Sequence, residues 1–167
     1  MSNKSNETQR LKMKGDFPYC GANGILDFIN DYKIDDEVIL IAEDGGYFDE
    51  YLTRPIAYIM KGKFWVNNHA HILKAKAAFD QNFIFYSLVH KNILSYLASG
   101  TRAKLNKSEM YKIEICLPQS KQEQRKNAQI LTDMDAEIEA MEKKMEKYKM
   151  IKQGMMHNLL TGKIRFI

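Results

Sequence analysis

The 167-residue chain lacks the features that mark several classes of protein. Its two cysteines, Cys20 and Cys116, are too few for a disulfide scaffold or a four-cysteine zinc site. No apolar run approaches the roughly 18–20 residues that a membrane span needs, and the polar N-terminus lacks the apolar stretch of a signal peptide. We therefore expect a soluble cytoplasmic protein.

Several motifs for nucleotide and acyl chemistry are also missing. The chain has no G-x-G-x-x-G fingerprint, no Walker A motif and no G-x-S-x-G elbow. It also lacks the Asn- or Asp-Pro-Pro-aromatic motif with which amino-methyltransferases act on a flipped base. Nucleotide binding and base methylation by this chain therefore have no support, and we predict no cofactor.

The composition changes near Pro118, after which the chain has no proline and only two glycines. Residues 1–118 hold 15 basic and 14 acidic side chains, and residues 119–167 hold 10 and 7. Within the first part, residues 27–50 carry nine acids and one base, so the rest of that part is strongly basic. The formal net charge of +4 thus conceals an acidic segment beside a basic surface. We expect the acidic segment to face away from any bound phosphate.

The residues before Pro118 predict a mixed α/β domain over 15–118, preceded by a polar segment over 1–14. Apolar runs and one clean alternation predict strands at 37–42, 57–60, 64–73 and 112–118. In the last of these, the residues that we expect to point inward are Ile113, Ile115 and Leu117. Asp80 is the predicted N-cap of a helix over 81–97.

The residues after Pro118 predict one long helix over 119–160 and a tail over 161–167, which makes the fold class α+β. Ser120 and Glu123 form an S-x-x-E capping box. From Leu131, apolar residues recur at alternating steps of three and four, the heptad spacing of a coiled coil. The seam consists of Leu131, Met134, Ile138, Met141, Met145, Tyr148 and Met155, interrupted by Lys152. A helix of nearly 40 residues is about 58 Å long, more than a domain of about 100 residues can cover. The seam therefore predicts a second copy of the helix as its partner.

Two histidines stand two residues apart in the predicted strand 64–73, so His69 and His71 project from the same face. Two imidazoles can ligate a metal, but a site needs a third and a fourth ligand. We expect hydrogen-bonded, partly buried histidines instead, and no metal. Asn67 and His69 can also present donors and acceptors to base edges.

Two further groups carry a weaker signal. Glu43 and Asp44 follow the predicted strand 37–42 and resemble half of a nuclease carboxylate pair, but no specific spacing to a lysine or a third acid emerges. We expect a turn with solvated acids there. The segment 99–107 is small, polar and basic, and cations in such a loop can hold phosphates.

An ordered set of segments resembles the DNA-sequence-specificity subunit of type I restriction–modification systems. The segments are PYCGANGILDFINDY (18–32), VILIAEDGG (38–46), VNNHAHIL (66–73), ASGTRAKLN (98–106), IEICLP (113–118), EQRKNAQIL (123–131) and HNLLTGKIRF (157–166). The resemblance covers roughly residues 15–167, and its order is more specific than any one segment.

The resemblance implies a non-catalytic subunit whose target-recognition domain, residues 15–118, reads one half of a bipartite DNA site. One chain of the family usually carries two such domains and two helices, which pack as an antiparallel pair and act as a ruler. Two methyltransferase subunits dock on it, and a restriction subunit can join. This sequence has one domain and one helix, with a short polar segment where the family has a further strand-bearing segment. We therefore predict a half subunit that forms a homodimer through antiparallel helices and reads an inverted repeat with an unread spacer.

The predicted DNA contacts fall into two groups. Those to bases are Tyr19, Asn23, Asn67 and His69, and those to phosphates are Thr101, Arg102, Lys104 and Lys107. Two alternatives stay open. One is a truncated interaction protein that pairs with specificity or methyltransferase subunits without binding DNA. The other is a metal-dependent nuclease.

Overall fold

The computed structural model describes residues 13–98 and 103–165. The chain forms two compact units, residues 1–127 and residues 128–167. The long helix α4 (Lys121–Leu160) begins in the first unit and continues in the second. In the described ranges, no helix is long and apolar enough to cross a membrane.

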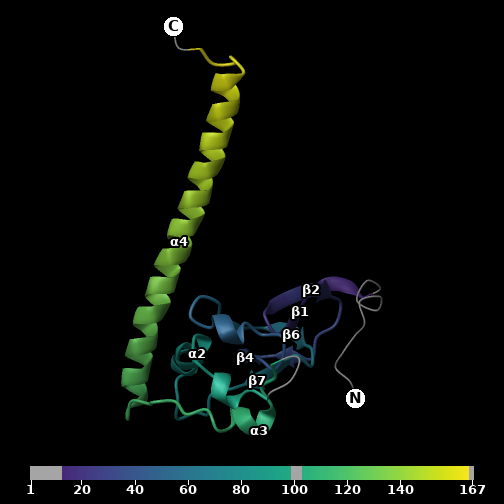
Figure 1. Cartoon of the computed structure of the whole chain (residues 1–167), viewed down its shortest axis with the longest axis vertical. Helices are drawn as coiled ribbons and strands as arrows, with labels where there is room; N and C mark the ends of the chain where they lie inside the picture. Colours follow the sequence, from purple (N-terminus) through teal and green to yellow (C-terminus); the bar gives the residue numbers. More distant parts are fainter. Residues whose placement is uncertain (1–12, 99–102, 166–167) are drawn as a thin grey trace. The chain divides into compact units, whose positions relative to one another are not determined.

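The first unit contains a four-stranded sheet with the strand order β2-β1-β6-β3 (Figure 1). β1 (Lys14–Gly21) and β2 (Gly24–Ile29) form an antiparallel hairpin. Its turn ends at Gly24, whose φ of 120° favours glycine. β6 (Lys63–Val66) lies parallel to β1, and the two-residue β3 (Ile34–Asp35) pairs with β6. The sequence did not predict β1 or β2, because glycine and polar residues interrupt their apolar pattern.

A second sheet has the strand order β5-β4-β7, and both pairings are antiparallel. β4 (Val38–Ala42) and β5 (Ala57–Met60) confirm the strands predicted at 37–42 and 57–60. The single strand predicted over 64–73 is wrong in part, because a turn divides it into β6 and β7 (Ala70–Leu73). The two halves join different sheets, so this turn carries the chain from one sheet to the other.

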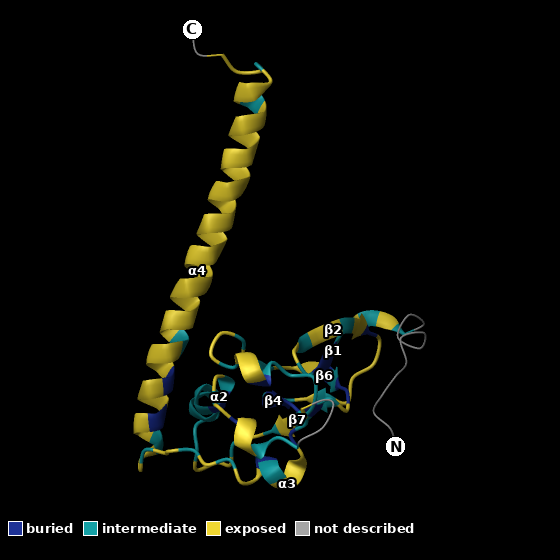
Figure 2. Cartoon of the chain, viewed as in Figure 1, coloured by how far each residue is buried: buried dark blue, intermediate teal, exposed yellow. Residues whose placement is uncertain are grey.

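β4 is the centre of the core, and all five of its residues are buried (Figure 2). Its alternate side chains enter two different hydrophobic clusters. Ile39 and Ile41 pack in one cluster, which includes Ile56, Ile93 and Leu105. Val38 and Leu40 pack in the other, with the β1 and β6 residues Cys20, Phe64 and Val66. A strand covered on both faces needs apolar residues at every position, which explains its continuous apolar sequence.

Asp80 is the N-cap of α2 (Gln81–Val89), as predicted, and its side chain accepts a hydrogen bond of 3.0 Å from the backbone N–H of Phe83. The helix is shorter than the predicted 81–97. It ends at Val89, and the chain continues irregularly to a 3-10 turn at Leu94–Tyr96. A second 3-10 turn, Phe48–Glu50, and the short helix α3 (Lys107–Met110) complete the elements between the strands and α4.

The strand predicted at 112–118 is wrong, because this segment pairs with no strand among the described residues. The backbone N–H of Ile113 instead donates to Met110 as part of a turn. Ile113 and Ile115 are half-buried and line an apolar cavity of about 300 Å³, whereas Leu117 is 40% exposed. The alternation therefore reflects side-chain burial without a backbone ladder.

α4 confirms the predicted long helix, which makes the α+β fold class correct. The hydroxyl of Ser120 accepts a hydrogen bond of 3.1 Å from the backbone N–H of Glu123, as one half of the predicted capping box. At the other end, Gly162 adopts a φ of 71°, and its N–H donates to the Leu159 carbonyl. A left-handed glycine after the last turn is a common way to end a helix.

Candidate nucleic-acid interface

Three chain segments meet where β4 ends. The backbone N–H of Glu43 donates to the carbonyl of His69 at 2.8 Å, and the N–H of Leu105 donates to the carbonyl of Glu43 at 2.7 Å. Lys104 forms isolated antiparallel bridges with both Asp44 and Ala98. These backbone contacts hold the turn after β4, the start of β7 and the segment at 103–105 together.

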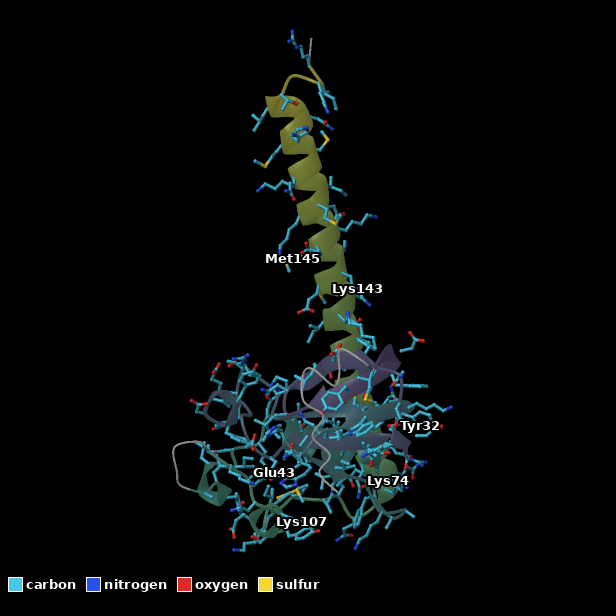
Figure 3. The ribbon with its side chains drawn as sticks, turned by 90° about the vertical axis from the view of Figure 1, so that its right-hand side faces the viewer. Tyr32, Glu43, Lys74, Lys107, Lys143 and Met145 are labelled. Atoms are coloured by element: carbon cyan, nitrogen blue, oxygen red, sulfur yellow. The ribbon has the colours of Figure 1, made fainter. Side chains whose placement is uncertain are left out.

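Five side chains from these segments form what we term the β4-end cluster, which consists of Glu43, Asp44, His69, His71 and Lys104 (Glu43 is labelled in Figure 3). The Nδ1 atom of His69 lies 2.7 Å from a carboxylate oxygen of Asp44. The Lys104 ammonium lies 2.9 Å from a carboxylate oxygen of Glu43. His71 donates from Nε2 to the Leu105 carbonyl at 2.7 Å, and its Nδ1 lies 3.6 Å from Glu43. The two carboxylates thus each lie within 4 Å of a histidine ring nitrogen.

The hydrogen bond from Lys104 to Glu43, together with the charge of Glu43, raises the pKa of the Lys104 ammonium above its usual value. Lys104 is therefore an ion-paired cation at the end of β4. The acidic segment 27–50, which we predicted to face away from phosphates, places Glu43 beside Lys104 and Asp44 beside His69. Both acids lie beside the segment 103–105 because β4 ends next to it.

Two predicted base-contact residues lie beside the turn after β4 and are at least partly exposed. Asn23, in the β1–β2 turn, is exposed, and its Nδ2 donates to the Gly45 carbonyl at 2.9 Å. His69 is partly exposed and is oriented by Asp44. If the His69 ring is neutral with its proton on Nδ1, its Nε2 is a hydrogen-bond acceptor. Asn23 and His69 therefore present polar groups on either side of the Asp44–Gly45 turn.

The other two predicted base-contact residues are buried. Asn67 is 8% exposed, and its side-chain oxygen accepts a hydrogen bond of 2.9 Å from the backbone N–H of His69. Tyr19 is 1% exposed, and its ring centroid lies 6.4 Å from that of Trp65. A buried side chain does not reach a base edge, so we remove both from the base contacts. Asn67 fixes the turn that carries His69, and Tyr19 belongs to the core.

Two of the four predicted phosphate contacts, Lys104 and Lys107, lie in the described part of the chain. Thr101 and Arg102 lie outside the described residues. Of the described residues nearby, Ala98 donates a backbone hydrogen bond of 2.8 Å to the Lys104 carbonyl. Lys107 is exposed at the start of α3, with its ammonium 5.9 Å from the Tyr111 ring centroid. The structure therefore places Lys104 in the β4-end cluster and Lys107 three residues beyond it.

One feature beside Asn23 was missed by the sequence analysis. The Arg54 guanidinium lies 3.1 Å above the Tyr47 ring, and Arg54 and Glu50 form an ion pair at 3.5 Å. Next to this stack is a small, mainly apolar cavity of about 330 Å³, lined by Asn23, Gly24, Ile25, Tyr47, Pro55, Tyr58 and Met60. No local motif marks these residues, because they come together only when the β1–β2 turn packs beside β5.

Within residues 13–98 and 103–165, no group of three or more His, Cys, Asp or Glu side chains is arranged to hold a metal ion. The arrangement of the β4-end cluster is consistent with the partly buried, hydrogen-bonded histidines predicted from the sequence.

The second candidate surface is the apolar seam of α4. Its seven residues are each between 40% and 60% exposed: Leu131, Met134, Ile138, Met141, Met145, Tyr148 and Met155. Figure 2 shows nearly the whole of the helix in the colour of exposed residues. Apolar side chains in such a row are characteristic of a helix that pairs with another helix.

Comparisons with known proteins agree with the family predicted from the sequence. The model of the type I restriction modification DNA specificity domain matches residues 2–150. A putative type I restriction enzyme specificity subunit of Haemophilus influenzae is 38% identical over 108 residues, covering 65% of this chain and 27% of that protein. The putative type I restriction enzyme MjaX specificity subunit of Methanocaldococcus jannaschii is 32% identical over 158 residues, covering 93% of this chain and 36% of that protein.

A solved structure has the same fold. The type I restriction-modification system S subunit from M. genitalium matches with a TM-score of 0.65 at 16% identity, over 96% of this chain and 42% of that chain. This chain therefore spans well under half the length of each of these proteins. The match to the family model, which extends from the first unit into α4, shows that the chain belongs to the family of type I restriction modification DNA specificity domains.

Proposed function

We propose that this chain is the DNA-sequence recognition subunit of a type I restriction–modification enzyme. Residues 15–118 read one half of a bipartite site, and a second copy, joined through α4, reads the other half. The observation that carries the proposal is the family match over residues 2–150. In this proposal the chain itself is not catalytic. Methyltransferase subunits supply methylation, and a restriction subunit supplies cleavage.

The DNA-facing surface in this proposal is the edge formed by the β4-end cluster and the β1–β2 turn. Asn23 and His69 present hydrogen-bonding groups there, and amide and imidazole groups can read base edges in the major groove. Lys104 and Lys107 supply positive charge on the same stretch of chain, where they contact phosphates. Glu43 holds the Lys104 ammonium in place at 2.9 Å, so this cation is positioned before DNA arrives.

The salt dependence of DNA binding tests the role of Lys104. Each phosphate contact contributes about 0.9 to the slope of log affinity against log salt concentration. We expect Lys104→Ala to lower this slope by about one and to weaken binding to all duplexes equally, as measured by fluorescence anisotropy. Lys61→Ala is the matched control, because Lys61 is also an exposed lysine paired with a glutamate, Glu37, at 3.2 Å. Equal slopes for the Lys104→Ala variant and the unmodified chain contradict the assignment.

The charges along α4 support an antiparallel homodimer. Residues 128–142 carry five acids and no base, whereas residues 143–165 carry seven bases and one acid. A parallel pair places like charges beside each other over both halves. An antiparallel pair places the acidic half of each helix beside the basic half of the other, and charges that flank a seam set the orientation of coiled coils.

Sedimentation velocity tests the pairing. We expect the chain to sediment as a dimer at tens of micromolar. Ile138→Asp places a charge in the seam and should produce a monomer. Ala136→Asp is the matched control, because it introduces the same charge two residues away and off the seam, and it should remain a dimer. A strictly monomeric unmodified chain removes the basis of the pairing.

A further inference from the structure

We infer that the two copies of α4 pair in one particular antiparallel register, in which the twofold axis crosses the seam between Met141 and Met145, level with residue 143. This inference rests on the homodimer proposed above and specifies which residues of the two copies meet. The spacing of the apolar seam restricts the registers, and the distribution of charge selects one of them.

The seam permits only a few antiparallel registers. Its residues follow one another at steps of three and four, and this series reads the same in both directions about residue 143. With the axis at Lys143, Leu131 meets Met155 of the second copy, Ile138 meets Tyr148 and Met141 meets Met145. A slip by one heptad preserves the apolar contacts along most of the seam. It moves the axis by three and a half residues, to about residue 139 or 147. Apolar contacts alone therefore do not determine which of these three registers forms.

Charge separates the three registers sharply. The acidic segment 133–142 carries five acids and no base. With the axis at Lys143 it lies beside residues 144–153, which carry four bases and one acid. The slip toward the N-terminus places it beside residues 137–146, which carry four acids and two bases. The slip toward the C-terminus places it beside residues 151–160, which carry one base and no acid. Only the central register brings a strongly basic segment to the acidic one.

The same register accounts for the residue that interrupts the seam. Lys152 occupies a seam position, and with the axis at Lys143 it meets Met134 of the second copy. Met134 lies between Asp133 and Asp135 in the sequence. The aliphatic stem of a lysine can pack on an apolar neighbour while its ammonium reaches outward. The Lys152 ammonium then lies next to two carboxylates of the second copy, so the interruption reinforces the register.

The exposed surface of α4 is consistent with a partner along this whole stretch. Every seam residue from Leu131 to Met155 is at least 40% exposed. In Figure 3 the labelled side chains of Lys143 and Met145 project from the helix. Residue 128, where the second unit begins, is 15 residues from the axis. The two copies of this residue are then about 45 Å apart along the helix pair at 1.5 Å per residue, more than one turn of B-DNA at about 34–36 Å.

Cysteine cross-linking in the full chain tests the register, in a Cys116→Ser background because Cys116 is exposed. Leu131→Cys and Met155→Cys proteins are mixed, equilibrated and treated with a short thiol-reactive cross-linker. We expect a cross-linked dimer from the mixture and none from either protein alone. In the inferred register two copies of residue 131 are about 36 Å apart at 1.5 Å per residue. The substituted side chains are exposed in the single chain, so the variants should fold.

The other outcomes overturn the register and are distinguishable from one another. A cross-linked dimer from Leu131→Cys alone indicates parallel helices. A cross-link between Leu131→Cys and Tyr148→Cys, instead of Met155→Cys, indicates the slip toward the N-terminus, and one between Met134→Cys and Leu159→Cys indicates the slip toward the C-terminus. No cross-link in any mixture that still sediments as a dimer indicates another interface. If all the proteins sediment as monomers, the homodimer itself is wrong, and the register falls with it.

Discussion

The side chain of Gln124 connects the first turn of α4 to other residues of the first unit, and replacing it tests how much these contacts stabilise the fold. Gln124 is 2% exposed, although most residues of this helix are exposed. Its side-chain oxygen accepts a hydrogen bond of 3.0 Å from the N–H of Asp80, the N-cap of α2. Its side-chain nitrogen donates to the Pro118 carbonyl at 3.1 Å. One amide thus connects α4, α2 and the segment that joins them.

Replacing Gln124 by leucine retains most of the side-chain volume and removes both hydrogen bonds. A typical hydrogen bond contributes about 1 kcal/mol net, and a partner left buried without one costs about 1–3 kcal/mol. Both partners here are only partly buried, so water can reach them in part. We therefore expect the free energy of unfolding to fall by about 2 kcal/mol. With a urea dependence of about 1.5 kcal/mol/M, the unfolding midpoint should fall by about 1.3 M.

Trp65 is the only tryptophan in the chain and lies in β6, so its fluorescence reports unfolding of the first unit. Gln122→Leu is the matched control, because Gln122 lies two residues away in the same helix and is exposed. We expect its midpoint to stay within a few tenths of a molar of that of the unmodified chain. Equal midpoints for Gln124→Leu and Gln122→Leu refute the reasoning, because the two hydrogen bonds then contribute nothing to stability.

Three further predictions concern cysteines and a glycine. Burial raises the pKa of the Cys20 thiol from 9.0 to about 11, so the unfolded chain loses this proton at a lower pH than the folded chain. The contribution of Cys20 to stability is therefore present below pH 9 and is lost as the pH rises toward 11, which urea unfolding at pH 8 and at pH 10.5 can measure against Cys20→Ala. The exposed Cys116 should react with a thiol reagent at once, and Cys20 only after unfolding. Gly154 lies inside α4 with open space around it, so Gly154→Ala should stabilise the helix by about 1 kcal/mol, seen as a higher midpoint in circular dichroism. An unchanged or lower midpoint contradicts this.

Strands with strong local signals were predictable, and those that depend on a distant partner were not. β4 was found because a strand covered on both faces must be apolar throughout, and α4 because its capping box and heptads are local patterns. The alternation at 112–118 was equally clear but formed no strand. Alternation predicts which side chains are buried, but a strand also requires another strand to supply hydrogen bonds.

The β4-end cluster shows the same limit for the candidate site. Glu43, Asp44, His69, His71 and Lys104 each attracted attention in the sequence, but as three separate groups with separate roles. Their pairing depends on β7 and the 103–105 segment both meeting the end of β4, and contacts between residues so far apart in the chain leave no local pattern. Tyr19 shows the converse error. An aromatic residue in a family segment was predicted to read bases, whereas it is part of the core.

The most direct test of the proposed function is a selection of bound duplexes from a random DNA pool by the full chain, followed by sequencing. It should be done with the chain alone and with the methyltransferase subunit of its system. The account predicts enrichment of an inverted repeat whose two half-sites are held at one fixed separation, with no preference in the spacer. An enriched single half-site without a fixed partner contradicts reading by a pair. A pool that remains random under both conditions contradicts sequence recognition by this chain.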